Sequence, residues 1–304
     1  MPPRSPLPPR HGLQAAWVRT PDRVTGAPAP YATLGDFLHA RLAPTAPVAE
    51  MLAEGRFVLA DGSPVTGPEP YTPHTFVWFH RELRPEPVRD WDLSLLHRDD
   101  RLVVLDKPHG LSTIPRGRHV TQSAVVLLRQ QLGLPELGPA HRLDLLTAGV
   151  LVLTTRQEWR RPYQEAFAAR QVHKTYEALG RHDPDLRLPL RVTSHIVKER
   201  GFFQAREIPG APPNAETYIE RTEVRGDTAR YRLTPTTGRT HQLRIHLSSL
   251  GIPIVNDPLY PEILDWNPDE IGPPLQLVAR ELSFTDPVDG SERTFISRRP
   301  LAWP

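Results

Sequence analysis

Four short segments place ionisable side chains beside apolar runs, which is a common setting for functional groups. They span residues 105–112, 141–150, 173–179 and 237–247. The second is the most distinctive, because Leu143, Leu145 and Leu146 flank Asp144. Burial raises the pKa of a carboxyl group unless a cation or hydrogen bonds favour its charged form. The segment could equally form a turn that Asp144 caps, with Arg142 paired at the surface.

The fourth segment predicts a helix that begins after Thr240 as its N-cap and ends near residue 251. Leu243 starts the core stripe of this helix, and Arg244 lies next to the stripe. We therefore expect Arg244 to be partly buried, and a buried arginine requires a carboxylate partner. Asp144 is the carboxylate that the sequence offers.

The first and third segments each carry a single distinctive group. Lys107 precedes a proline–glycine turn at the end of an apolar run, but alone this pattern favours an ordinary turn with a surface lysine. Alternation along the third segment places Lys174 and Tyr176 on one face of a strand. Tyr176 could present its ring and hydroxyl to a base, although a tyrosine on a half-buried strand more often serves packing.

Strands and helices alternate around these segments. Apolar runs predict buried strands at residues 102–105 and 149–154. Helices are predicted at residues 123–132 and 162–169, the second with Pro162 in its first turn. Residues 217–234 predict an antiparallel hairpin.

The N-terminal part differs in composition from the rest. Residues 1–30 are proline-rich without apolar periodicity, which predicts a mostly disordered tail. Residues 31–84 predict two short helices, the first capped by Thr33, and strands at 57–59 and 76–78. Within them the string LAEGRFV at 52–58 resembles the S-four-type RNA-binding module. Residues 85–96 predict a linker, and residues 97–304 the larger domain.

Composition excludes several classes of protein. The 304 residues include no cysteine, which removes disulfides, thiolate nucleophiles and cysteine-ligated metals. His241 and His246 are five residues apart and do not share a helix face, so they form a poor metal pair. No apolar run approaches the roughly 18 residues of a membrane span, and the first residues lack a signal-peptide core. We therefore expect a cytoplasmic protein.

In this order the four segments resemble the RluA-type pseudouridine synthases. The matching strings are DKP at 106–108, HRLD at 141–144, K-x-Y at 174–176 and GRTHQLR at 238–244. The resemblance covers about residues 95–300, and His141 rather than glycine before Arg142 favours the RluA type over the RsuA type. The sequence departs from the family pattern at two positions: Ala148 stands where serine is common, and Asn256-Asp257 replaces a usual Gly-Asp. Asparagine can take the place of this glycine because it tolerates a positive φ.

The resemblance implies a fold, a reaction and residue roles. The fold would be α+β, with a mixed, largely antiparallel central sheet flanked by helices. The enzyme would be an isomerase that turns one uridine of structured RNA into pseudouridine without a metal or other cofactor. Asp144 would be the essential ionised carboxylate, acting as nucleophile or general base, and Arg244 would hold it ionised. Tyr176 would contact the uracil, and Arg142 would fill the space that the extruded base leaves. Further candidate contacts are His141, Lys107, Arg239, His241 and Leu243.

The implied partner is RNA, either 23S ribosomal RNA or transfer RNA, bound by a monomer with no membrane attachment. Two other interpretations compete with this one. The protein could be a non-catalytic RNA-binding protein that retains the synthase fold. That interpretation requires the loss of a catalytic residue, and none is lost in the four segments. A glycosidic-bond hydrolase usually needs two carboxylates, and only Asp144 lies in a convincing motif.

Overall fold

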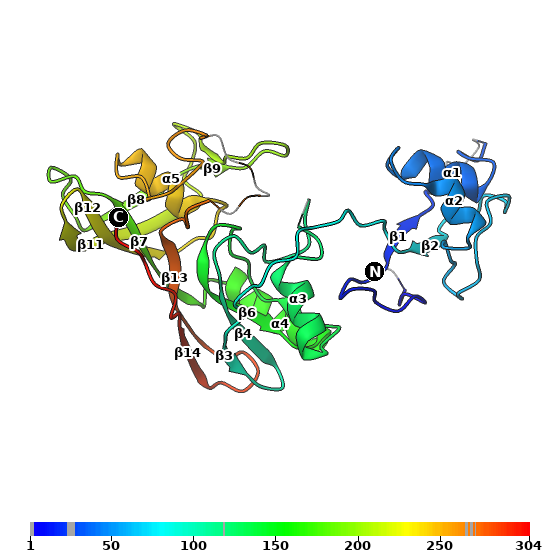
Figure 1. Ribbon diagram of the computed structural model, residues 1–304, viewed down its shortest axis with the longest axis horizontal. Coiled ribbons are helices and arrows are strands. Elements are labelled where there is room, and N and C mark those ends of the chain that lie inside the picture. The colour runs from blue at the N-terminus through cyan, green and yellow to red at the C-terminus, as the bar shows by residue number, and fades with distance from the viewer. Residues whose placement is uncertain (1–2, 23–27, 118, 265–266, 268–269, 271) are drawn as a thin grey trace. The chain divides into compact units, whose positions relative to one another are not determined.

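The computed structural model of the protein describes residues 3–22, 28–117, 119–264, 267, 270 and 272–304. The chain divides into two compact units, Met1–Pro85 and Glu86–Pro304 (Figure 1). Most of the predicted linker therefore belongs to the second unit. The carboxylate of Glu86 accepts hydrogen bonds from three backbone N–H groups of that unit, those of Val120, Thr121 and Gln122.

The first unit contains two short helices and a two-stranded sheet. Helices α1 (Leu34–Arg41) and α2 (Val48–Ala53) lie where the sequence predicts them. Thr33 caps α1 as predicted, because its hydroxyl accepts a hydrogen bond from a backbone N–H of the first turn at 3.1 Å. Strand β1 (Ala16–Arg19) pairs antiparallel with β2 (Phe76–Phe79). The resemblance of this unit to an RNA-binding module stays a prediction.

The structure corrects two predictions for this unit. Residues 16–19 of the predicted disordered tail form β1, whose Ala16 and Val18 pack against the core of the helices. A four-residue strand in a proline-rich stretch is too short for periodicity to reveal. Residues 1–2 and 23–27 of the tail lie outside the described residues. The strand predicted at 57–59 is reduced to isolated bridges of Val58 with Pro64 and Trp78.

A ten-stranded sheet forms the second unit. Eight of its strands follow one another in the order β3, β4, β6, β13, β7, β12, β11 and β8, while β5 pairs with β6 and β14 with β13. Their bounds are β3 (Leu95–Arg98), β4 (Leu102–Lys107), β5 (Gly138–Pro139), β6 (Ala148–Thr154), β7 (His173–Arg181), β8 (Leu190–Ser194), β11 (Ala215–Arg225), β12 (Thr228–Pro235), β13 (Leu277–Thr285) and β14 (Glu292–Ile296). All of these pairs are antiparallel except β6 with β13. The predicted mixed, largely antiparallel α+β fold is confirmed.

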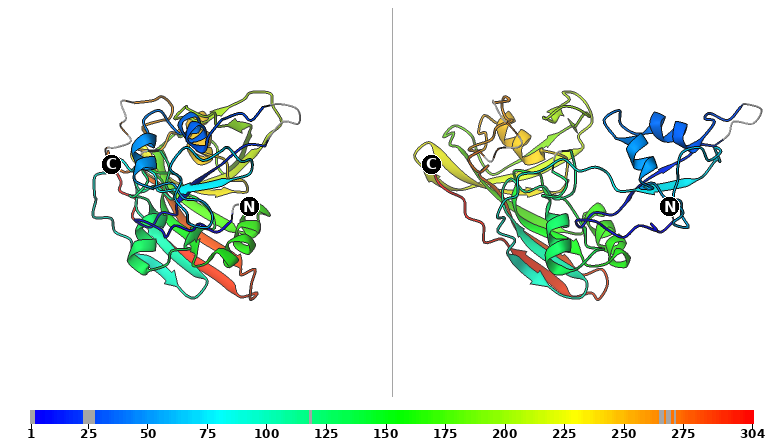
Figure 2. Two further views of the ribbon diagram at one scale, coloured as in Figure 1. Left: turned by 90° about the vertical axis from the view of Figure 1, so that its right-hand side faces the viewer. Right: turned by 45° about the vertical axis from the view of Figure 1, so that its right-hand side comes forward.

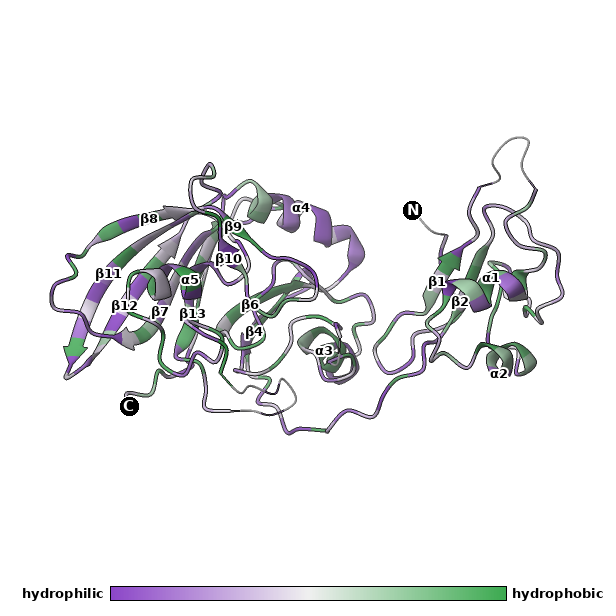
Figure 3. Ribbon diagram, turned by 90° about the horizontal axis from the view of Figure 1, so that it is seen from above, coloured by the Kyte–Doolittle hydropathy of each residue, from purple (hydrophilic) through white to green (hydrophobic). Residues whose placement is uncertain are grey.

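Helices α3 (Ala124–Leu132) and α4 (Gln157–Ala168) cover opposite faces of β4 and β6. Alternate side chains of β4 separate the two cores: Val103 packs with α3, and Leu102 packs with α4. Figure 2 shows both helices beside this half of the sheet, and Figure 3 shows a mostly polar α4. Burial on both faces explains why these strands read as continuous apolar runs.

Helix α5 (Gln242–Ser249) covers the other half of the sheet. Its Leu243 and Leu247 pack with side chains of β7, β11 and β12. Strands β9 (Ile196–Val197) and β10 (Arg206–Glu207) form a separate small hairpin. No helix among the described residues is long and apolar enough to cross a membrane.

Helix α4 begins five residues earlier than predicted. Pro162 lies inside the helix rather than in its first turn. The prediction used proline as a start signal, but an interior proline removes one backbone hydrogen bond and can be tolerated at a cost. The side chain of Glu136 stabilises the true start by accepting a hydrogen bond from the Gln157 N–H at 3.1 Å.

Gly149 lies where the central strands β6 and β13 come closest. Its φ is +112°, and a Cβ atom there would lie 2.3 Å from the carbonyl oxygen of Ala279. Only glycine fits this approach. The pairing of β6 with β13 places the start of β6 at the centre of the sheet. The segment 141–147, which directly precedes β6, therefore lies there too.

Candidate active site

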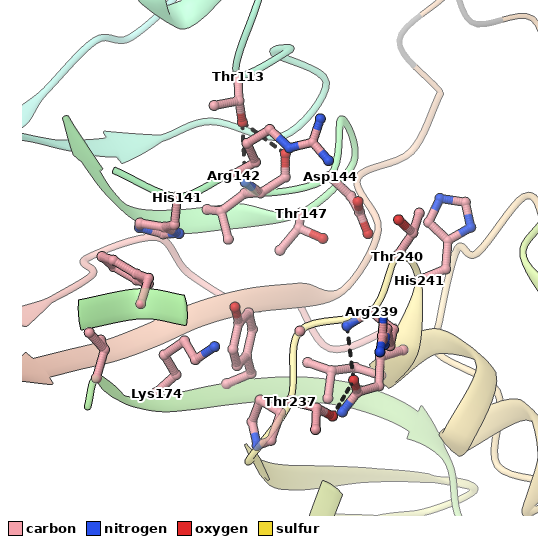
Figure 4. Close-up of a pocket in the computed structure, with 18 of the residues that line it drawn as sticks. Thr113, His141, Arg142, Asp144, Thr147, Lys174, Thr237, Arg239, Thr240 and His241 are labelled. Carbon is pink, nitrogen blue, oxygen red and sulfur yellow. Dashed lines mark hydrogen bonds between the residues drawn. The ribbon is translucent and has the colours of Figure 1, made fainter. Parts of the chain in front are cut away.

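A cavity of about 1050 Å³ opens in the second unit, a size typical of ligand sites. All four segments singled out from the sequence line it, the first through Ser112 alone, although they lie far apart in the chain. Figure 4 shows Asp144 and Thr147 opposite Lys174, with Arg239 and His241 nearby. Asp144 is the only carboxylate among the described residues that line the cavity.

The backbone around Asp144 is fixed by the segment that follows β4. The Thr113 hydroxyl donates to the carbonyl of Leu143 at 2.8 Å and accepts from its N–H at 3.2 Å (Figure 4). His109 donates from Nδ1 to the carbonyl of Leu146 at 2.8 Å. The loop therefore holds Asp144 through backbone contacts on both sides of it.

Lys107 lies beneath this loop and not in the cavity wall. It is fully buried, and its Nζ donates to the carbonyls of Leu111 at 2.8 Å, Pro108 at 3.1 Å and Leu145 at 3.2 Å. Burial lowers the pKa of Lys107 to about 7, whereas the nearby Asp144 carboxylate raises it. Only the ammonium form can donate three hydrogen bonds, so these contacts favour the charged form. The interpretation as a surface lysine is wrong.

The predicted pairing of Arg244 with Asp144 is also wrong. Arg244 donates from Nε to Asp257 Oδ2 at 2.8 Å and from Nη2 to Asp257 Oδ1 at 2.5 Å. The two side chains are 2% and 1% exposed. The N–H groups of Leu259 and Tyr260 donate to the same carboxylate, at 2.9 and 3.2 Å. Arg244 nevertheless lines the cavity, so its position there is fixed by a buried bidentate ion pair.

Helix α5 starts one residue later than predicted. His241, and not Thr240, occupies the N-cap position, in the left-handed conformation with a φ of 59°. The side chain of Gln242 accounts for the difference: it donates to the carbonyl of Glu216 at 2.9 Å and accepts from the Thr237 hydroxyl at 2.7 Å. These bonds attach the turn before α5 to β11.

His241 makes a hydrogen bond with Tyr260 that identifies its tautomer. The Tyr260 hydroxyl lies 2.9 Å from His241 Nδ1 and 2.8 Å from both the N–H and the carbonyl of Ala205. The hydroxyl has one proton, which the buried Ala205 carbonyl requires, so His241 Nδ1 must donate. Burial lowers the pKa of His241, although the Asp144 carboxylate raises it. The ring is therefore a neutral imidazole whose Nε2 is an acceptor.

Tyr176 and His141 also line the cavity, and both are uncharged at neutral pH. Burial, and then the charge of Asp144, raise the pKa of the Tyr176 hydroxyl. The His141 ring stacks on Phe167 with centroids 4.4 Å apart, and its Nε2 accepts from the N–H of Val152 at 3.1 Å. Burial lowers the pKa of His141 to about 3. His141 thus attaches its segment to β6 as a neutral ring.

Four exposed arginines surround this site: Arg116, Arg142, Arg170 and Arg239. None of them pairs with a carboxylate in the part of the chain that the structure describes. Arginines elsewhere are often paired, as in the contact of Arg161 with Glu165 on α4. Apart from Arg239 Nε, which donates to the carbonyl of Asn214 at 3.2 Å, the donors of these guanidinium groups are available to an anionic ligand.

The cavity brings together eight of the nine predicted site residues, and Lys107 supports it from below. Those that line it are His141, Arg142, Asp144, Tyr176, Arg239, His241, Leu243 and Arg244. Sequence reasoning missed Thr113, Asp257 and Tyr260. A signal for Asp257 did exist, because Asn256 has the predicted positive φ, 62°, and marks a tight turn. Thr113 and Tyr260 carry no such signal, since their partners are backbone groups or residues distant in sequence.

Comparisons with known proteins agree with this geometry. A family model described as RNA pseudouridylate synthase matches residues 101–249. The dual-specificity RNA pseudouridine synthase RluA of Escherichia coli K12 is 34% identical over 224 residues, which are 69% of this chain and 94% of that protein. The human pseudouridylate synthase RPUSD2 is 34% identical over 187 residues, which are 60% of this chain and 33% of that protein.

Solved structures show the same likeness. Human RNA pseudouridylate synthase domain containing 4 has a TM-score of 0.53 at 28% identity, over 68% of this chain and 88% of that one. Human RNA pseudouridylate synthase domain containing 1 has a TM-score of 0.56 at 26% identity, over 71% and 87% of the two chains. The match extends across most of each human chain.

Proposed function

Because the chain belongs to the RluA-type RNA pseudouridine synthases, we propose that Asp144 is the essential carboxylate of its active site. The enzyme is an isomerase that acts on uridine in RNA. The bond from uracil N1 to ribose C1′ breaks and a bond from C5 to C1′ forms. The C5 proton is lost and N1 gains one, so no atom is added or removed. Asp144 would act as nucleophile or as general base in this exchange.

One observation carries this proposal: Asp144 is the single carboxylate among the described lining residues, and cationic groups surround it. Lys107 lies close enough for the Asp144 carboxylate to raise its pKa, and Arg244 lines the same cavity. A reaction that needs one anionic side chain has one candidate here. A hydrolase, which usually needs two carboxylates, is not favoured.

The other lining residues would recognise the nucleotide. A uridine inside folded RNA must be extruded, which costs a few kcal/mol. Arg142 would occupy the vacated space, and the neutral Tyr176 would contact the uracil. His141, Leu243 and Lys107 would position the segments that hold the base. Arg239 and His241 would contact RNA directly.

We further propose that the substrate is a structured ribosomal or transfer RNA. The Escherichia coli relative is named as a dual-specificity enzyme, which is consistent with either class. The protein would act as a cytoplasmic monomer without a metal or other cofactor. A non-catalytic RNA-binding protein with the same fold is the alternative.

The test is a pseudouridine map of total RNA from a deletion strain beside its parent. At least one site should be lost on deletion and restored by the wild type. Asp144→Asn should not restore it, although the variant folds and still binds RNA. Asp185→Asn is a matched control, because Asp185 is exposed and lies outside the cavity. Restoration by Asp144→Asn would overturn the assignment, and free uracil as product would favour a hydrolase.

A further inference from the structure

Three helices among the described residues end in the same hydrogen-bonded turn. After α5, the N–H groups of Gly251 and Ile252 donate back to the last helical turn at 3.0 and 3.1 Å. After α2, Gly55 and the residue that follows it donate in the same way, at 3.1 and 2.9 Å. In this turn the first residue after the C-cap takes the left-handed conformation, where glycine is strongly preferred.

Helix α4 ends in this turn without glycine. The N–H of Arg170 donates to the carbonyl of Phe167 at 3.2 Å, and the N–H of Gln171 donates to Ala166 at 3.0 Å. Arg170 has a φ of 60°, close to the values of 64° at Gly55 and 76° at Gly251. An arginine is strained in this conformation, so a property of its side chain must offset the preference for glycine.

The contacts of the Arg170 side chain within the chain do not explain why an arginine stands at this position. The side chain of Arg170 is exposed and makes no ion pair or hydrogen bond among the described residues. A cation at a helix C-terminus is mildly favourable, and α4 has no basic residue in its last turn. A lysine would serve that purpose equally, and this alternative predicts nothing about ligands.

The position of Arg170 in the cavity explains why an arginine stands where glycine is preferred. Arg170 lines the cavity that contains Asp144, at the start of the segment that leads into β7 and Tyr176. It is one of the four exposed arginines there that have no carboxylate partner among the described residues. A guanidinium group with free donors matches a phosphate, which it can bind through two parallel hydrogen bonds.

We infer that Arg170 is a substrate-binding residue that holds a phosphate of the RNA strand carrying the target uridine. The inference rests on the proposed function of the cavity. The strained backbone is retained because glycine would form the same turn without the charge. Arg170 is thus a contact that the motifs of the sequence do not include.

The test measures pseudouridine formation in total RNA from a strain that lacks the gene, with limiting full-length enzyme and a series of KCl concentrations. The variants are Arg170→Asn, which tolerates the left-handed conformation, Arg170→Gly and Arg170→Lys. Arg161→Gln is the matched control, because Arg161 lies on the same helix, pairs with Glu165 and does not line the cavity. Urea unfolding of each variant is measured in parallel.

We expect Arg170→Asn and Arg170→Gly to lower the rate about tenfold at low salt. The slope of log rate against log salt should become shallower by about 0.7 to 0.9, the value for one phosphate contact. Arg170→Lys should keep the slope and recover part of the rate, and Arg161→Gln should match the wild type. Arg170→Gly should unfold at the same or a higher urea concentration.

An unchanged rate and slope in Arg170→Asn and Arg170→Gly would overturn the inference. So would a lower urea midpoint for Arg170→Gly together with an unchanged slope, because Arg170 would then serve the fold. Both results leave the wild type active. A wild type that forms no pseudouridine in this RNA would instead overturn the proposed function, and this inference with it.

Discussion

The buried pair of Arg244 and Asp257 can be tested by a double-mutant cycle. Each charge is almost fully removed from water, with 2% and 1% of the side chain exposed. Removing one partner of such a pair costs about 3–5 kcal/mol. Two backbone N–H groups still bond to Asp257 when Arg244 is lost, so we expect the lower end, about 3 kcal/mol, for Arg244→Met. This is a large share of a typical stability of about 5–15 kcal/mol.

Asp257→Asn should cost a similar amount, since it leaves the guanidinium with a neutral partner. The double variant, Arg244→Met with Asp257→Asn, removes both charges and keeps an acceptor for the two N–H groups. Replacing both members of a buried pair is often nearly neutral. We therefore expect the double variant to lie within about 2 kcal/mol of the wild type, against about 6 kcal/mol for additive effects.

Urea unfolding followed by circular dichroism measures the four free energies of unfolding, provided the slopes agree. Additive costs would refute the reasoning, and so would a cost below about 1 kcal/mol for Arg244→Met. Pseudouridine formation by the stable double variant then separates fold from chemistry. A folded double variant with wild-type turnover would show that the charge of Arg244 does not act on the cavity.

Two further predictions concern buried ionisable groups. Lys107→Met removes the ammonium donor from three carbonyls, and those of Pro108 and Leu111 then have no donor among the described residues, whereas that of Leu145 keeps the Gly110 N–H at 3.0 Å. The variant should lower turnover at least tenfold and stability by about 3 kcal/mol, measured by single-turnover assays and urea unfolding. Near wild-type turnover would contradict a role in holding the Asp144 loop. His246 is fully buried, its two ring nitrogens lie 3.0 and 2.9 Å from the hydroxyls of Ser194 and Thr217, and burial lowers its pKa to about 4. The unfolded chain binds a proton between about pH 6.5 and 4 that the folded chain does not, so stability should fall as pH drops, by about 2 kcal/mol at pH 5. His246→Gln should remove this part of the pH dependence in urea midpoints at pH 5 and 7, and an unchanged dependence would contradict it.

Local sequence patterns predicted the strands and helices whose position depends mainly on burial of their own side chains. The strands β4 and β6 are buried on both faces, and their continuous apolar runs indicated them. The start of α5 depends instead on hydrogen bonds from Gln242 to β11, which no local pattern records. Helix α4 shows a third case, because Pro162, a residue typical of a first helical turn, lies in its interior.

The partner of Arg244 could not be predicted for a related reason. Burial of an arginine implies a carboxylate but does not say which one. The motif around Asp144 favours that residue as the partner, whereas Asp257 follows Arg244 by thirteen residues in an irregular connection. The end of α4 lies within one residue of its prediction, but the left-handed conformation of Arg170 has no sequence signal, because glycine is the residue expected at that position.

The formal charge of +2 conceals how the arginines are distributed. Many of them neutralise a carboxylate of the same chain, as Arg244 does with Asp257 in the interior and Arg161 with Glu165 on the surface. Such pairs contribute little to the field that an approaching polyanion meets. The exposed arginines around Asp144 have no such partner among the described residues, so their charge acts outward. The salt dependence of RNA binding should therefore follow the number of these cavity arginines and not the net charge of the chain.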